Sequence, residues 1–562
     1  MLHFTNMLKP KIIILVLFLF FALPQMAVAA FIGQQDKFSI EKKYDLSGRE
    51  TLSAELLKIG SRLYYYADLA WWNSLSQLER SDVSLALENV DREFSQRIYP
   101  TLTSTFGSEW NPGIDKDPVM TLLLHPMVQS AGGYTNYGDE YVKVQNPSSN
   151  EREMMYLNTL FITSPSAKGF LAHEFVHVIT FNQKNIIRNV EEEVWLNEAR
   201  AEYAPALLAY EEEFEGSNLQ RRVKDFLGQS GDALFTWENS RYDYGVVNLF
   251  MQYIIDHYGV GVLKDSMSSG SSGAASISEA LAKNGFGKTF AQVFVDWTIA
   301  VLVNDCNVGK NYCYLNANLR SLRIVPQGHF LPLSGDNVLT TNNVMKDWSG
   351  HWFKIVGGGD TLKIEVQGDA KAQFSIPYIV DERGNISVRF LTLDSAQKGT
   401  LYVQDFNTSV KSVTLIPSSQ TEISERDDAP FYQFGLVIST VKKTQEQEDQ
   451  ALITQLLAQI DSLKKRIADL QAQLASLANQ KGFACSQFTK DLSFGMKNDV
   501  EVRCLQEFLK VLVTGNFFTY THEAVIRFQE KYAQEILAPI GKSKGTGYVG
   551  FLTRQKLNQL FQ

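Results

Sequence analysis

The chain has 562 residues and a mass of 63.4 kDa, which corresponds to roughly three to four domains at about 150 residues each. Hydrophobic residues make up 44% of the sequence and charged residues 20%, so a largely disordered chain, a collagen and a multi-span membrane protein are excluded. The formal net charge is -9, whereas nucleic-acid-binding proteins have an excess of basic residues, so no nucleic-acid partner is expected. Cysteine is too rare, with 4 residues, for a disulfide-dense scaffold.

The N-terminus, residues 1–30, has the three parts of a secretory signal peptide. Lys9 and Lys11 precede an apolar run over residues 12–23, and a stretch of small residues follows. The run is shorter than the roughly 20 residues that span a bilayer, although an uncleaved anchor is the alternative. We therefore predict cleavage at the end of this segment, after residue 29 or 30, and a secreted protein.

An exported chain can form disulfides, and the cysteines fall into two local pairs. Cys306 lies close to Cys313 along the chain, and Cys485 lies close to Cys504. An oxidising compartment permits both pairs to close, so we predict these two bridges. Free buried thiols are the alternative.

Residues 31–319 mix helical and strand patterns. Amphipathic helices are predicted over 53–67 and 81–98, and a buried strand over 119–124. Residues 171–210 are strongly helical in pattern. This part of the chain is therefore predicted to be one α+β domain.

Residues 320–440 have a different sequence pattern. Short runs such as 361–366 and 386–391 alternate between apolar and polar residues, and Gly, Asp and Asn separate them at turn-like intervals. This pattern predicts an all-β sandwich domain.

A heptad pattern follows in residues 441–480. Apolar residues fill every a and d position of the frame: Ile453, Leu456, Ile460, Leu463, Ile467, Leu470, Leu474 and Leu477. Ile mostly at a and Leu at d favours a parallel two-stranded coiled coil, and hence a homodimer. A helix that folds back on its own chain, or a helical spacer, is the alternative.

The segment with candidate metal-binding and catalytic residues is the HExxH motif at residues 173–177. His173 and His177 are four residues apart, so both imidazoles project from one face of a helix and can bind one zinc ion, with Glu174 beside them. The neighbouring residues are apolar, which indicates a buried helix. Burying two histidines and a glutamate is costly unless they are satisfied by a metal or by hydrogen bonds.

A third ligand is available downstream. Glu198 and Glu202 are also four residues apart on a predicted helix. One carboxylate can complete a His-His-Glu site with an open position for water, and the other can orient a ligating imidazole. The alternative is a solvated acidic face, because acidic runs at 191–193 and 211–213 lie nearby.

The motifs at 173–177, 195–198 and 201–203 together resemble the gluzincin branch of zinc metallopeptidases, most closely its secreted hyicolysin-like type. The similarity extends roughly over residues 50–260. Ala199 stands where relatives commonly have Gly, a mild change that should not remove activity.

The resemblance implies a zincin fold with a thermolysin-like site. It implies one catalytic Zn²⁺ on His173, His177 and Glu198, with Glu174 as the general base and Glu202 supporting a ligand. In such a site the base accepts a proton from water and passes it to the leaving nitrogen of a peptide bond.

Two tyrosines are candidates for the donor that stabilises the oxyanion. Tyr242 and Tyr244 lie where related enzymes place an aromatic or His donor, and we favour Tyr244 slightly. Ordinary structural tyrosines are the alternative. The strand-like segment 153–157 just before the helix is a candidate for pairing its free edge with an extended polypeptide substrate.

Residues 481–562 resemble a small three-helix peptidoglycan-binding domain. The resemblance rests on Leu505-Gln506, Phe528-Gln529 and the glycines that mark turns between the helices. Phe518 stands where the family usually has Gly or Asp, and the insert over 533–544 is longer than usual. A generic helical interaction module is the alternative.

The sequence therefore predicts an exported zinc metalloendopeptidase that its last domain holds at the cell wall. A peptidoglycan stem-peptide hydrolase with the same chemistry is one alternative. A non-catalytic structural protein of the wall is the other.

Overall fold

The computed structural model describes residues 30–333, 338–359, 361–421, 430–441, 445–479 and 485–561. The predicted signal peptide lies outside these residues except for Ala30. The described chain is a multidomain protein with helices and several sheets, and it divides into two compact units. The first comprises residues 30–284 and 315–320, and the second comprises the rest. None of the described helices is both long and apolar enough to cross a membrane.

The first unit contains a six-stranded mixed sheet in the order β1-β2-β3-β4-β6-β5. Strands β3, β4 and β6 run parallel to one another, and the other neighbouring pairs are antiparallel. The strands are β1 (Gln35–Ser39), β2 (Thr51–Ile59), β3 (Leu63–Asp68), β4 (Met120–His125), β5 (Gly133–Tyr134) and β6 (Met154–Asn158). The predicted buried strand over 119–124 is confirmed by β4.

The predicted helix over 53–67 is wrong, because these residues form most of β2 and β3. On β2, Leu52, Ala54 and Leu56 are buried at every second position, which is the period of a strand. Gly60 lies in the turn that joins the two strands, where an added Cβ would come within 3.0 Å of the Leu63 carbonyl oxygen. Pairing with β1 and β4 makes this segment two strands, and a short sequence window includes neither of these partner strands.

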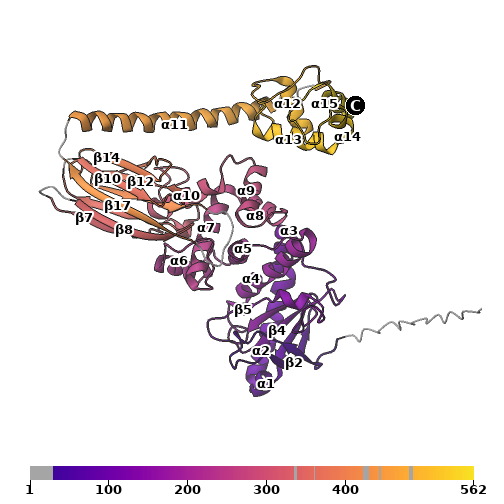
Figure 1. Ribbon diagram of the computed structural model, residues 1–562. Helices are drawn as coiled ribbons and strands as arrows, with labels where there is room; N and C mark the ends of the chain where they lie inside the picture. The colour runs from indigo at the N-terminus through magenta and orange to yellow at the C-terminus, as the bar shows by residue number, and fades with distance from the viewer. Residues whose placement is uncertain are drawn as a thin grey trace, which may run out of the picture. The chain divides into compact units, whose positions relative to one another are not determined.

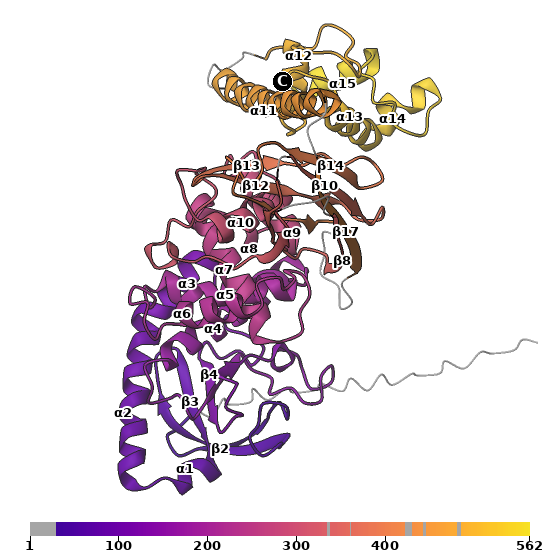
Figure 2. The same ribbon diagram turned by 90° about the vertical axis from the view of Figure 1, so that its left-hand side faces the viewer.

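The second predicted helix, over 81–98, is confirmed by α2 and the π-helix η1 that continues it. A capping box between Ser76 and Glu79 begins α2, which runs beside the strands of the sheet (Figure 2). Lys58 of β2 forms an ion pair of 2.8 Å with Glu88 of α2. The helices of this unit are α1 (Leu69–Ser74), α2 (Gln77–Glu93), η1 (Phe94–Ile98), α3 (Tyr99–Phe106), η2 (Tyr137–Glu140), α4 (Ala167–Thr180), η3 (Phe181–Ile186), α5 (Val194–Leu207), α6 (Asn218–Gly228), α7 (Arg241–Tyr258), α8 (Val260–Met267), α9 (Gly273–Lys283) and η4 (Ala317–Leu319) (Figure 1).

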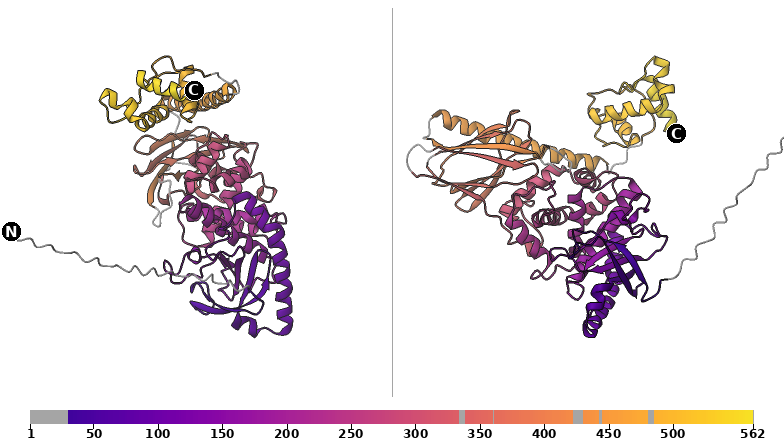
Figure 3. Two further views of the ribbon diagram at one scale, coloured as in Figure 1. Left: turned by 90° about the vertical axis from the view of Figure 1, so that its right-hand side faces the viewer. Right: turned by 60° about the horizontal axis from the view of Figure 1, so that its bottom comes forward.

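The second unit contains two sheets that share one hydrophobic core, which is the arrangement of a β-sandwich (Figures 1 and 3). One sheet has the order β14-β10-β17-β8 and the other the order β13-β12-β15-β9-β7. The strands are β7 (Gln327–Leu331), β8 (Val338–Lys346), β9 (Phe353–Gly357), β10 (Thr361–Gly368), β12 (Pro377–Glu382), β13 (Asn385–Phe390), β14 (Lys398–Val403), β15 (Ser412–Leu415) and β17 (Phe431–Val441), with a small pair of β11 (Phe374–Ser375) and β16 (Ser418–Ser419).

Helix α10 (Phe290–Val303) belongs to the same unit as the sandwich. The rings of Phe290 and Phe294 each lie 5.2 Å from the Trp348 ring, and the Trp352 indole donates a hydrogen bond of 2.9 Å to the Thr298 carbonyl. These contacts place residues 285–314 with the sandwich, whereas the sequence put the division at residue 319.

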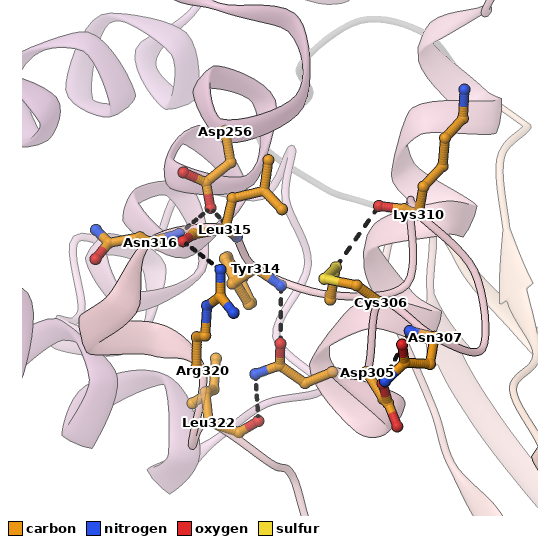
Figure 4. Close-up of a disulfide and its surroundings, with 12 residues drawn as sticks. Asp256, Asp305, Cys306, Asn307, Lys310, Tyr314, Leu315, Asn316, Arg320 and Leu322 are labelled. Carbon is orange, nitrogen blue, oxygen red and sulfur yellow. Dashed lines mark hydrogen bonds between the residues drawn. A yellow bond between two sulfur atoms is a disulfide. The ribbon is translucent and has the colours of Figure 1, made fainter.

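Both local cysteine pairs are joined in the structure. Cys306 bonds to Cys313 in the loop after α10, and Cys485 bonds to Cys504. Figure 4 shows the first bridge beside Asp305, whose carboxylate accepts hydrogen bonds of 2.9 and 3.0 Å from the backbone and side chain of Asn307.

The heptad segment is one helix, α11 (Gln445–Asn479). The side chains of Ile453, Ile460 and Leu463 are between 44% and 58% exposed, and the stripe residues Leu456, Ile467 and Leu470 lie in the same range. The side chains of Leu474 and Leu477 are outside the described residues. The apolar stripe of α11 therefore presents a half-exposed face where its side chains are described.

The C-terminal helices are α12 (Val500–Phe508), α13 (Thr519–Lys531), α14 (Ala533–Ile536), η5 (Ala538–Ile540) and α15 (Phe551–Leu560). Buried glutamines organise them in a repeated way. Gln506 accepts a hydrogen bond of 2.7 Å from the Thr514 backbone, and Gln529 accepts one of 2.7 Å from the Thr546 backbone. Gln506 therefore holds the Thr514-Gly515 turn ahead of α13, and Gln529 holds the Thr546-Gly547 turn ahead of α15.

Candidate metal centre

The HExxH motif lies on α4, a helix in the core of the first unit. The Phe175 ring packs 5.0 Å from Phe94 and 5.5 Å from Tyr99, which fixes the rotation of the helix. Because His173 and His177 are one turn apart, their rings lie on the same face, with centroids 4.9 Å apart.

The carboxylates come from α5, which packs against α4. Trp195 and Leu196 on this helix are fully buried, so its orientation is also fixed by packing. Glu198 and Glu202 are one turn apart and both lie beside the histidines of α4.

Three ligand atoms converge between the two helices. The Nε2 atoms of His173 and His177 are 3.2 Å apart, and Glu198 Oε2 lies 3.3 Å from the first and 3.7 Å from the second. Tetrahedral zinc with bonds of about 2.0–2.1 Å holds its ligand atoms roughly 3.3–3.4 Å apart. The Glu198 Oε2 atom is also buried without a well-formed hydrogen bond. These residues therefore fit a zinc ion, and within the described ranges they are the one such group of His, Cys, Asp and Glu.

Polar contacts behind the ligands orient each imidazole. His177 Nδ1 lies 3.1 Å from Asn197 Oδ1, so Nδ1 donates and Nε2 is left as an acceptor for a metal. The Asn197 amide in turn donates a hydrogen bond of 2.9 Å to the Tyr137 hydroxyl oxygen. On the other ligand, His173 Nδ1 lies 3.5 Å from Glu202 Oε1.

Glu202 is itself held by an arginine. Arg222 of α6 donates hydrogen bonds of 2.6 and 2.7 Å to the two carboxylate oxygens, and Asn218 donates one of 2.9 Å. Burial opposes the charge of Glu202, but the attraction of Arg222 outweighs it and lowers the pKa of Glu202 to about 2. Glu202 is therefore an anion at neutral pH, and its Oε1 attracts the N–H group at Nδ1 of His173.

Glu174 directly follows His173 on α4 and lies close to β5. Thr135 donates a hydrogen bond of 3.1 Å to Glu174 Oε2, and burial raises the pKa of Glu174. A Cβ added at Gly133 would lie 3.3 Å from Glu174 Oε1 and 2.5 Å from the Tyr156 carbonyl oxygen, so only glycine lets β5 approach this closely.

The two candidate tyrosines have different neighbours. The Tyr244 ring lies 4.5 Å from the Arg222 guanidinium, and burial together with the charges of Glu198 and Glu202 raises the pKa of Tyr244. The Tyr242 hydroxyl accepts a hydrogen bond of 2.9 Å from the exposed Arg241 instead. Tyr244 therefore lies against the arginine that holds Glu202, and its hydroxyl donates a hydrogen bond of 3.4 Å to Asn239 Oδ1.

Sequence reasoning missed several residues of the site. Asn197 lies inside the quoted motif at 195–198, but nothing distinguished its side chain. Thr135 and Arg222 come from a loop and from another helix, and no pattern in the sequence links either of them to α4.

The predicted free edge of the segment 153–157 is wrong. Strand β6 pairs with β4 on one side and with β5 on the other, through Gly133 opposite Leu157 and Tyr134 opposite Tyr156. The outermost strand of the sheet on this side is therefore β5, which carries the glycine that approaches Glu174.

No protein family and no curated protein matches the sequence. Among solved structures, PliG, a periplasmic lysozyme inhibitor of g-type lysozyme, matches 20% of this chain. The protein from Aeromonas hydrophila shares 11% identity over 98% of its length, and that from Salmonella Typhimurium 14% over 99%, each with a TM-score of 0.14. A family GH115 4-O-methyl-alpha-glucuronidase, BtGH115A, shares 8% identity over 59% of this chain and 53% of its own, with a TM-score of 0.13. Scores this low assign neither a fold nor a function to this chain.

Proposed function

We propose that this chain is an exported zinc-dependent metalloendopeptidase with a zincin fold of the gluzincin type. The observation that carries the proposal is the convergence of the His173, His177 and Glu198 ligand atoms at the spacing of a tetrahedral zinc site. The carboxylate of Glu174 beside this group supports a hydrolytic role over a purely structural one.

The site residues divide the chemistry among them. Zinc, when bound, supplies a Lewis acid and lowers the pKa of water. Glu174 accepts the water proton and passes it to the leaving nitrogen, while Thr135 keeps one oxygen of this carboxylate in place. Tyr244 is the candidate donor to the oxyanion, and the outer edge of β5 is the candidate surface on which an extended peptide binds.

Two other hypotheses differ in how they use this site. A peptidoglycan stem-peptide hydrolase would share the ligands and the base, and the resemblance of residues 481–562 to a peptidoglycan-binding domain favours a location at the cell wall. A non-catalytic structural protein would have no use for the open ligand group.

Incubation with casein and with purified sacculi separates these possibilities. Cleavage of casein, inhibition by 1,10-phenanthroline and recovery with Zn²⁺ are expected for the endopeptidase. Release of stem peptides from sacculi without casein cleavage would identify the stem-peptide hydrolase. A secreted protein that cleaves neither substrate and contains no zinc would exclude both enzymes.

The ligand assignment makes a separate prediction. His173→Ala should lose the bound zinc, because two remaining ligands hold zinc far more weakly than three. Zinc per chain, measured by inductively coupled plasma mass spectrometry after gel filtration, should fall from about one to near zero. His257→Ala, near the C-terminal end of α7, is the matched control and should keep its zinc. Equal zinc contents in the two variants would refute the assignment.

The half-exposed stripe of α11 supports the proposal of a parallel coiled-coil homodimer. Light scattering after gel filtration should give twice the chain mass for the wild type and the single chain mass for Leu463→Lys, because a charge at a d position opposes helix pairing. Ser462→Lys places the same side chain beside the stripe and should remain dimeric. A monomeric wild type would reject the homodimer.

A further inference from the structure

The outward face of the sheet β14-β10-β17-β8 is hollowed into a trough with a volume of about 850 Å³. The loops at 368–370 and around Asp394 contribute to its lining. The Asp394 carboxylate accepts hydrogen bonds of 2.9 Å from the backbones of Ala396 and Lys398, which shape that loop. None of the residues that line this trough belongs to the metal site or to the C-terminal domain.

Strand register places the lining residues in rows across the sheet. Asn342 lies opposite Gly435, Gly435 opposite Gln367, and Gln367 opposite Lys398. This row crosses all four strands as an amide, a glycine, a second amide and an ammonium group.

The next row on the same face lies two residues along each strand. It consists of Thr340, Val437, Glu365 and Thr400. Since alternate residues of a strand share a face, both rows line the same trough.

Gly435 opens the centre of the first row. It lies in the middle of β17, where glycine weakens a strand and commonly marks a close approach by another molecule. A Cβ added there would lie 3.2 Å from Asn342 Oδ1, so any larger residue would fill the space between the two amides.

The side chains that line the trough indicate which kind of ligand it binds. Side-chain amides both donate and accept hydrogen bonds, as do the threonine hydroxyls, which suits a ligand rich in hydroxyl groups. The lining holds three carboxylates, Glu365, Asp369 and Asp394, and one ammonium group, Lys398. Lys363 beside the trough pairs with Glu365 at 2.9 Å, so carboxylates still outnumber the ammonium groups and a polyanion is disfavoured. The central strands β10 and β17 are each paired on both sides, so an extended peptide lying in the trough finds no free strand edge there.

We infer that the trough binds an uncharged oligosaccharide. Its length across four strands is about 14 Å at roughly 4.8 Å per strand spacing, which accommodates a short run of sugar units. The inference is independent of the metal site, because none of the lining residues belongs to the first unit.

Calorimetric titration of the full secreted chain tests this inference. The probes are pentasaccharides of β-1,4-linked glucose, of β-1,4-linked N-acetylglucosamine and of galacturonate. At least one of the two neutral probes is expected to bind and the galacturonate probe is not. Binding of galacturonate alone, or of none of the three, would overturn the inference.

Variants locate the binding on this face. Asn342→Ala/Gln367→Ala removes two amides and should weaken binding at least about tenfold, and Gly435→Leu should abolish it by filling the trough. Arg389→Ala, on β13 of the opposite sheet and 46% exposed, is the control and should bind like the wild type. Unchanged affinity in both trough variants would show that the sugar binds elsewhere in the chain and would overturn the inference. Thermal unfolding of each variant confirms that the fold is retained.

Discussion

Replacing Glu174 with glutamine is expected to lower the rate of peptide hydrolysis by about 10²- to 10⁴-fold, the usual contribution of a general base. Glutamine keeps the shape of the side chain and an oxygen that can accept the Thr135 hydrogen bond, but its amide cannot take up the water proton. The three ligand atoms on His173, His177 and Glu198 are untouched by the change. Zinc content should therefore stay at about one ion per chain.

Casein hydrolysis and metal analysis on the same preparation measure both halves of this expectation. Glu212→Gln makes the same chemical change at an exposed position and should retain full activity. Loss of zinc in Glu174→Gln would mean that Glu174 acts through the metal ligands. Retention of wild-type activity would remove Glu174 from the role of base.

The second large effect is expected for Arg222→Met. Glu202 is 2% exposed, and Arg222 donates to both of its oxygens at 2.6 and 2.7 Å. Removal of one partner leaves a buried charge without compensation, which costs about 3–5 kcal/mol of unfolding free energy. Because Glu202 also faces His173 Nδ1, zinc affinity should fall by about 10- to 100-fold.

Urea unfolding of the zinc-free protein measures the first effect, and competition with a zinc chelator measures the second. Lys224→Met is a control on the same helix: its side chain is exposed, and the change should stay within about 0.5 kcal/mol. Glu202→Gln/Arg222→Met should recover part of the loss, since it removes the stranded charge. Equal stability of the Lys224 and Arg222 variants would show that this ion pair contributes little.

Local patterns predicted the parts of the site that one helix can encode. The spacing of His173 and His177 requires only a single turn, and the same is true of Glu198 and Glu202 on α5. The helix over 81–98 and the strand over 119–124 were predicted for the same reason, because each has a clear period of its own. The prediction of a helix over 53–67 is wrong, because the tyrosines and leucines of this segment suit a helix face as well as a pleated surface. Only the strand partners distinguish the two.

Contacts between distant segments could not be predicted. Thr135 lies 39 residues before Glu174 and Arg222 lies 20 residues after Glu202, and neither separation carries a periodic signal. The same limitation hid β5, whose two residues cover the edge of β6, and the packing of α10 against Trp348.

The sequence alone determined the broad class of the chain: several domains, a mildly acidic composition, cysteines that pair locally and a zinc-type motif, all of which depend on counts or on neighbours within a few residues. The tertiary structure decided how Glu198 reaches the two histidines, which tyrosine lies beside Arg222 and how four strands align into a polar trough. These features depend on the packing of helices and the register of strands, which are set by many weak contacts between segments far apart in the chain.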